Sequence, residues 1–138
     1  MLFKTKKQKT ILVVEDEENI RKIITLYLES WGFYCIGVED GEKAIKAARN
    51  KKPELIILDV NIPGIDGFTV CRILRKKPNT KEIPIILLTG SGKPSDVDQG
   101  FLSGADAYVL KPVNWDQLRS KISSLLNIEI LKKAADSS

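Results

Sequence analysis

Short apolar runs alternate with segments of helical periodicity along most of the chain. The apolar runs occupy residues 11–14, 33–38, 55–58, 85–88 and 107–110. Most of them are continuous apolar blocks without in–out alternation, which is typical of parallel strands that helices cover on both faces. The pattern therefore predicts five largely buried strands.

The intervening segments place apolar residues on one face of a helix. A stripe of five such residues precedes the second strand: Ile20, Ile23, Ile24, Leu28 and Trp31. The last helix is predicted to begin after Asn114, an N-cap residue with Gln117 three positions later. Three further helices are predicted around residues 44–48, 68–74 and 95–102, and the last of these is short and polar.

Five βα units in succession predict a doubly wound α/β fold. Right-handed crossovers then place helices on both faces of a five-stranded parallel sheet, with the flavodoxin-like (βα)5 strand order 2-1-3-4-5. The 138 residues fit one domain. We expect this domain to span residues 10–127, between a basic N-terminal tail at 1–9 and a C-terminal helix extension or tail at 128–138.

The composition excludes several chemistries. With no histidine, the chain cannot contain a Ser-His-Asp or Cys-His nucleophile system, a histidine-ligated zinc site or a histidine phosphodonor. The two cysteines lie far apart in the sequence and indicate small buried side chains in a reducing compartment.

The net charge of +4 comes from lysines in residues 1–10. The remainder is neutral and shows no basic face of the kind that nucleic-acid readers carry.

The basic tail indicates a solvated segment, with a weak membrane or nucleic-acid tether as the alternative. The apolar run that follows it, residues 11–14, is shorter than the roughly 7–15 apolar residues of a signal peptide. No stretch reaches the roughly 18 apolar residues of a membrane span. We therefore expect a soluble, cytoplasmic protein without a membrane partner.

Ionisable and hydroxyl side chains gather where the predicted strands end. Glu15 and Asp16 follow the first strand, Asp59 ends the third, Thr89 ends the fourth and Lys111 follows the fifth. Open α/β sheets bind ligands at this carboxyl edge, and Asp16 and Asp59 would face each other across the crevice between strands 1 and 3. Taken singly, each residue has an ordinary structural explanation, such as acids at a helix start or a solvated lysine. Their joint placement favours a site.

The residue types at this edge suit phosphoryl chemistry. Converging carboxylates require a proton or a cation among them, and an all-oxygen site suits Mg²⁺ or Mn²⁺. The Lys111 ammonium and the Thr89 hydroxyl suit phosphate oxygens. Asp59 is the candidate nucleophile because a carboxylate can take a phosphoryl group as an acyl phosphate.

Four segments that carry these residues resemble the receiver domain of two-component response regulators, the CheY-like family. They read ILVVEDE at 11–17, LIILDVNIPGIDG at 55–67, IILLTG at 85–90 and GADAYVLKP at 104–112. The resemblance spans about residues 10–127 and implies that Asp59 is the phosphoacceptor. It also implies that Mg²⁺ is held by the carboxylates of Asp16 and Asp59 and by the main-chain carbonyl of Asn61, with Glu15 acting through a metal-bound water.

The resemblance assigns further roles outside the acidic cluster. It implies that Thr89 and Lys111 bind phosphoryl oxygens, that Tyr108 is a rotamer switch coupled to Thr89, and that the Lys111–Pro112 peptide bond is cis. A half-buried strand aromatic is the alternative for Tyr108. Gly90 stands where relatives more often have alanine, which could loosen the following loop.

The function that the resemblance implies is Mg²⁺-dependent acceptance of a phosphoryl group from a histidine kinase or a histidine phosphotransfer protein. Catalysis would be limited to self-phosphorylation and autodephosphorylation, so we do not expect an enzyme. Because few residues follow Asn127, we expect no direct DNA binding. Output would then pass through the face of the fourth helix, fifth strand and fifth helix to another protein or to a second copy in a homodimer.

Three alternatives to this interpretation remain. The chain is a fragment of a longer regulator with a DNA-binding output; it is a haloacid-dehalogenase-type phosphatase; or it is a pseudo-receiver that takes no phosphate. Asn61 stands where the phosphatases have a second, acidic Asp, which disfavours them. The acidic residues and Lys111 are all present, which disfavours the pseudo-receiver.

Overall fold

Runs of valine, isoleucine and leucine form the central sheet. The computed structural model describes residues 8–130. The strands are β1 (Thr10–Val14), β2 (Tyr34–Val38), β3 (Leu55–Asp59), β4 (Ile85–Thr89) and β5 (Ala107–Leu110). They pair in parallel in the order β2-β1-β3-β4-β5. The predicted five-stranded parallel sheet and its strand order 2-1-3-4-5 are thereby confirmed.

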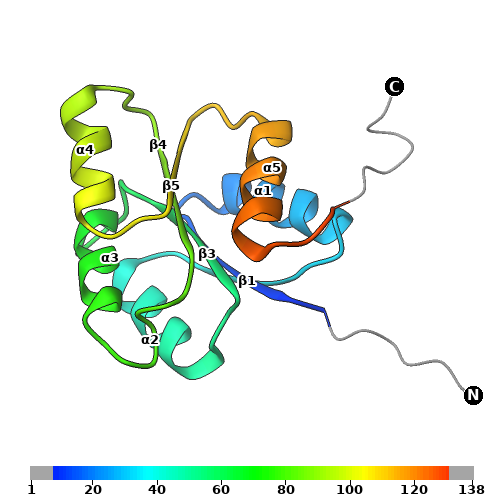
Figure 1. Cartoon of the computed structure of the whole chain (residues 1–138), viewed down its shortest axis with the longest axis horizontal. Coiled ribbons are helices and arrows are strands. Elements are labelled where there is room, and N and C mark those ends of the chain that lie inside the picture. The colour runs from blue at the N-terminus through cyan, green and yellow to red at the C-terminus, as the bar shows by residue number, and fades with distance from the viewer. Residues whose placement is uncertain (1–7, 131–138) are drawn as a thin grey trace, which may run out of the picture.

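Five helices connect the strands and cover both faces of the sheet. They are α1 (Glu18–Ser30), α2 (Gly41–Lys51), α3 (Gly67–Arg75), α4 (Pro94–Leu102) and α5 (Trp115–Leu126). Helices α2, α3 and α4 lie on one side of the sheet, and α1 and α5 lie on the other (Figure 1). The Asn114 side chain accepts a hydrogen bond from the main-chain N–H of Gln117, which confirms the predicted start of the last helix.

The sheet separates two hydrophobic cores. The α2/α3 core includes Leu12, Leu58 and Leu74, whereas the α1/α5 core includes Ile57 and Leu118. The central strands contribute to both because successive side chains of a strand point to opposite faces. Every residue of β3 and β4 is buried, which is why these strands read as continuous apolar runs.

The ends of the described region refine the predicted boundaries. Helix α5 ends at Leu126, where Asn127 takes the left-handed conformation (φ 53°) and caps the helix. Residues 128–130 are not helical, and the expectation from residue 128 onward was a helix extension or a tail. The rest of the expected extension, and most of the expected basic tail, lie outside the described residues. The Lys111–Pro112 bond is cis, and no helix between residues 8 and 130 is long and apolar enough to cross a membrane.

Candidate functional site

Three carboxylates meet at the carboxyl edge of the sheet. Glu15 and Asp16 directly follow β1, and Asp59 is the last residue of β3. These two strands are neighbours, and each of the three side chains offers an oxygen within 4.8 Å of the others. Glu15 and Asp59 are buried, with 1% and 2% of their surface exposed, and Asp16 is exposed. The predicted apposition of Asp16 and Asp59 across the crevice is present.

Lys111 joins the two buried carboxylates. Its Nζ lies 2.6 Å from Oδ2 of Asp59 and 3.0 Å from Oε1 of Glu15. The other oxygens accept main-chain hydrogen bonds, Oδ1 of Asp59 from the N–H of Asn61 at 3.0 Å and Oε2 of Glu15 from the N–H of Glu17 at 3.1 Å. Both buried carboxylates therefore have hydrogen bonds on each oxygen, which fixes their orientation.

The proton affinities follow from this crowding. Burial is the main reason that the pKa of Glu15 is raised to about 7; the charge of Asp59 acts in the same direction, while hydrogen bonds from Glu17 and Lys111 oppose it. Burial alone would lower the pKa of Lys111, but its hydrogen bonds to Asp59 and Glu15 raise it above the usual value. The ammonium is thus held charged beside Asp59.

The donor set and the charge balance fit a divalent cation. One ammonium faces three carboxylates, which leaves two negative charges when all are ionised. All the donors are oxygens, the preference of Mg²⁺ and Mn²⁺. Asn61, the fourth expected ligand, reaches the cluster here through its N–H bond to Asp59. Glu15, Asp16 and Asp59 could therefore hold a magnesium-type ion.

Gly67 shapes the loop around Asp59 and was not singled out in the sequence. A Cβ at this position would lie 2.6 Å from the main-chain oxygen of Asp59 and 2.7 Å from Cα of Val60. The Gly67 N–H also donates to the carbonyl of Val60 at 2.9 Å. Only glycine lets α3 begin this close to the strand end. The N-cap residue Asp66 directly before it was the available signal.

Thr89, at the end of β4, and Tyr108, on β5, are connected through Ser91. Thr89 is buried at the end of β4, and its Oγ1 accepts a hydrogen bond from the N–H of Ser91 at 3.1 Å. The hydroxyl of Tyr108 donates to the carbonyl of Ser91 at 2.8 Å. Within residues 8–130, no hydrogen bond joins the Thr89 hydroxyl to an acidic side chain. Ser91, which the sequence reasoning missed, connects the two residues.

Comparisons with known proteins identify the family to which this chain is similar. A family model, the response regulator receiver domain, matches residues 11–123. Transcriptional regulatory protein AfsQ1 of Streptomyces coelicolor is 43% identical over 117 residues, covering 85% of this chain and 51% of that protein. The DNA-binding dual master transcriptional regulator RpaA of Synechocystis is 38% identical over 116 residues, covering 84% and 48%.

A solved structure is similar in fold and contains a metal. It is the receiver domain of the sensor histidine kinase PA1611 from Pseudomonas aeruginosa PAO1, with a magnesium ion coordinated in its active-site cleft. The TM-score is 0.82 at 27% identity, and the match covers 88% of this chain and 99% of that one. Proteins with this fold thus include a magnesium-binding receiver.

These relatives correct the expected output. AfsQ1 and RpaA are transcriptional regulators, RpaA a DNA-binding one, and the chain spans about half the length of each. The expectation of no DNA binding, with output only to another protein or a second copy, is therefore wrong. That expectation was based on the few residues after Asn127 and on the zero net charge of residues 11–138. Neither observation indicates what the other half of a regulator such as AfsQ1 or RpaA does. The family match, the fold and the acidic edge together show that this chain belongs to the receiver domain family of two-component response regulators.

Proposed function

We propose that Asp59 is the phosphoacceptor of this receiver. The observation that carries the proposal is the position of its buried carboxylate, 2.6 Å from the Lys111 ammonium and within 4.8 Å of two further acids. The Asn61 N–H orients this carboxylate, and the Lys111 ammonium offsets its charge. Because the chain has no histidine, the phosphoryl group comes from a donor outside it, a phosphohistidine or a small acyl phosphate.

In the transfer step, a carboxylate oxygen of Asp59 forms a bond to phosphorus. The bond from phosphorus to the donor's nitrogen or oxygen breaks, and the donor leaves with that electron pair. Charge moves onto the phosphoryl oxygens and the leaving group, and Lys111 and Thr89 are the candidate partners for those oxygens. Hydrolysis of the acyl phosphate restores the carboxylate. The phosphoryl group then leaves as inorganic phosphate. The only catalysis we assign is this self-phosphorylation and the hydrolysis that removes the group.

We assign the cation site to Asp16, Asp59 and the main-chain carbonyl of Asn61, with Glu15 acting indirectly. Glu15 is buried and held by Lys111 and the Glu17 N–H, whereas Asp16 is exposed at the mouth of the site. A magnesium ion bound there would offset negative charge on the transferring phosphoryl group. The two cysteines among the described residues are free, which supports the reducing, cytoplasmic location proposed for this chemistry.

The signal leaves the site through Thr89, Ser91 and Tyr108. The Thr89 hydroxyl can donate its proton to a phosphoryl oxygen on Asp59 while its oxygen still accepts from the Ser91 N–H, so a Thr89 side chain drawn toward the phosphoryl group pulls the Ser91 segment with it. The Ser91 carbonyl accepts from the Tyr108 hydroxyl. A shift of the Ser91 segment therefore changes the hydrogen bond of Tyr108. We assign Thr89 and Tyr108 as the switch pair on this connection.

Phosphate-affinity gel electrophoresis after treatment with acetyl phosphate tests the acceptor. The wild-type chain should show a retarded band with Mg²⁺ and none with a chelator, and Asp59→Asn should show none in either case. Asp66→Asn is the matched control because it lies on the same connection and asparagine also caps helices well. A retarded band that persists in Asp59→Asn would refute the assignment.

Calorimetric titration with Mg²⁺ tests the ligand assignment. Asp16→Ala should weaken binding by at least about tenfold, and Glu15→Gln by less, because we place only Asp16 in direct contact with the ion. Equal losses in the two variants would show that both carboxylates ligate directly.

Two-dimensional NMR with and without beryllofluoride, which stands in for the phosphoryl group, tests the switch. Amide shifts should extend through Ser91 to the residues around Tyr108. Tyr108→Phe, which removes only the hydroxyl, should shrink the shifts on β5 and leave those beside Asp59 intact. Shifts confined to the immediate neighbours of Asp59 would contradict the connection.

A further inference from the structure

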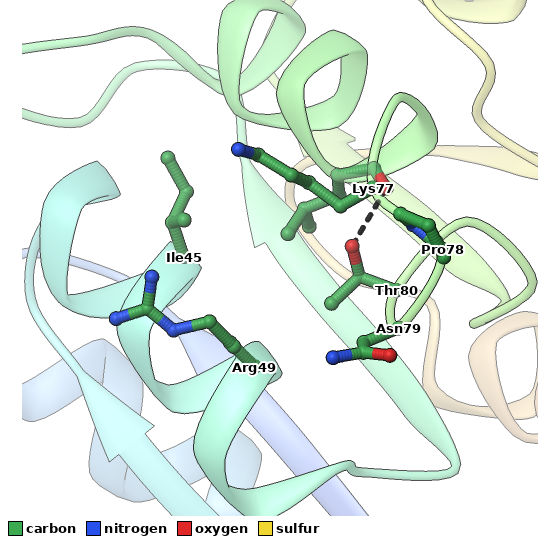
Figure 2. A pocket seen from close by; sticks show the side chains of 7 residues that line it. Ile45, Arg49, Lys77, Pro78, Asn79 and Thr80 are labelled. Atoms are coloured by element: carbon green, nitrogen blue, oxygen red, sulfur yellow. Dashed lines mark hydrogen bonds between the residues drawn. The ribbon is translucent and has the colours of Figure 1, made fainter.

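An apolar hollow lies between α2 and the turn that follows α3, on the opposite side of the sheet from α1 and α5. Its walls are the side chains of Ile45 on α2, Leu74 on α3, and Pro78 and Thr80 in the turn. The Thr80 hydroxyl donates to the carbonyl of Leu74 at 2.7 Å and is turned away from the opening (Figure 2). The polar group of this wall is thereby satisfied, and the hollow presents mostly carbon.

The wall of the hollow is preformed. Main-chain N–H groups of Thr80 and Lys81 both donate to the carbonyl of Lys77, at 3.1 and 2.9 Å. Thr80 and Leu74 are buried, with 2% and 1% of their surface exposed. A ligand would therefore meet an ordered surface and would not have to order the turn itself.

Two cationic side chains border the opening. Figure 2 shows the Lys77 ammonium and the Arg49 guanidinium on either side of Ile45. Within residues 8–130, neither cation forms a salt bridge. Both are exposed, so they are available to an incoming anion.

The surroundings of the hollow are basic as well. Residues 46–52 include four basic side chains and no acidic side chain. Residues 72–81 include five basic side chains and no acidic side chain. Interactions with helix C-termini explain cations in the last turns of α2 and α3. Such interactions do not explain the cations in the turn that follows α3. They also do not explain the apolar floor between the two helices. The overall neutrality of the folded body thus conceals a local positive surface.

The size of the hollow indicates what fills it. Its volume is about 120 Å³, and an apolar cavity of about 150 Å³ is large enough for a benzene molecule. The hollow therefore suits one branched aliphatic side chain. A nucleic-acid backbone offers negative charge but no apolar group of this kind, so charge and shape together favour a polypeptide.

We infer that this hollow is a docking site for an acidic segment of a partner protein, with one aliphatic side chain seated between Ile45 and Leu74 and flanking carboxylates on Arg49 and Lys77. The site is separate from the phosphoacceptor edge. The partner chemistry is thus an Asp- and Glu-rich segment with a single leucine or isoleucine anchor. Such a partner could bind whether or not Asp59 is phosphorylated.

An NMR titration of the full chain tests the inference, with a capped acidic peptide of about nine residues that carries one central leucine. Saturable amide shifts should appear at residues 45–52 and 74–81. A peptide with serine in place of the leucine should bind about fivefold more weakly, because the aliphatic burial is lost. Equal affinity for the two peptides would overturn the inference, since charge alone would then account for binding.

Paired charge reversals provide the second arm. The double variant R49E/K77E should weaken binding of the leucine peptide by about tenfold. The control K22E/K93E makes the same change in net charge on exposed residues of α1 and before α4, and should weaken it by less than about twofold. Three results would each overturn the inference. The two variants could weaken binding equally, or the peptide could show no saturable binding. Duplex DNA could also shift the same amides while the peptide does not.

Discussion

Arg75 is the side chain whose removal should most clearly test how the connections of this fold are held. It is the last residue of α3, and 20% of its side chain is exposed. Its Nε donates to the carbonyl of Gly104 at 2.8 Å, and its Nη1 donates to the carbonyls of Ile83 and Lys81 at 2.6 and 3.0 Å. Its Nη2 lies 2.8 Å from Oδ2 of Asp106. One guanidinium thus joins the end of α3 to the segments before β4 and before β5.

Arg75→Met removes all four hydrogen bonds and keeps an unbranched stem with similar helix propensity. Each lost bond costs about 0.5–1.5 kcal/mol, and partial exposure lets water replace some of it. We therefore expect a loss of about 2–3 kcal/mol in the free energy of unfolding. With a urea m-value of about 1.5 kcal/mol/M, the unfolding midpoint should fall by about 1.3–2 M.

Arg72→Met is the matched control for the urea experiment. Arg72 lies on the same helix and is exposed, and its side chain makes one long hydrogen bond, 3.3 Å to Oγ1 of Thr69. Its replacement should change stability by less than about 0.5 kcal/mol. If Arg75→Met cost no more than Arg72→Met, the four hydrogen bonds would not be holding the connections and the reasoning would be refuted.

Three further predictions concern packing, protonation and thiol reactivity. A Cβ at Gly100 would lie 2.9 Å from Cδ2 of Tyr108, so Gly100→Ala should lower stability in urea by about 1 kcal/mol, since the overpacking outweighs the gain in helix propensity. The same change should cost less in a Tyr108→Ala background, where Cδ1 of Leu87 would still lie 3.1 Å from the added Cβ. Stabilisation in the wild-type background would contradict the clash. Because the pKa of Glu15 is raised to about 7 in the folded chain, folding takes up a proton, and the Tm of the metal-free protein should fall from about pH 5 to about pH 8. Glu15→Gln should remove that fall and Mg²⁺ should reduce it; an unchanged fall in the variant would assign it to another group. Burial raises the pKa of Cys35 to about 12 and raises that of Cys71, so iodoacetamide should label both slowly near pH 8 and quickly in urea; rapid native labelling in mass spectra would contradict this.

The arrangement of the strands could be predicted because their burial leaves a direct trace in the sequence. Parallel strands covered on both faces must be apolar at successive positions, and β3 and β4 are buried at every residue. The acidic edge was equally accessible, since residues that end parallel strands share one side of a sheet. Asp16 and Asp59 could therefore be brought together on topology alone.

Features that depend on side chains reaching across the fold could not be predicted in this way. The partners of Arg75 lie 6 to 31 residues away along the chain, and a lone arginine in a helix carries no sign of them. The bond from Tyr108 to Ser91 spans 17 residues and depends on how the segment after β4 turns. The hollow beside Ile45 exists only because the ends of α2 and α3 lie together. Net charge concealed it, because a sum over the chain does not report where the charges lie.

The division of the interior by the sheet has a consequence for how such a protein can diverge. Ile56 and Ile57 are consecutive, yet the first packs with α2 and α3 and the second with α1 and α5. A change of volume on one face can reach the other only through the strand backbone, so substitutions on opposite faces should be nearly independent, while those on one face must compensate each other. The core residues beneath each helical layer can thus change during divergence without matching changes on the other face. The carboxyl edge, which belongs to the strands rather than to either layer, keeps its geometry while the surfaces around it acquire new partners.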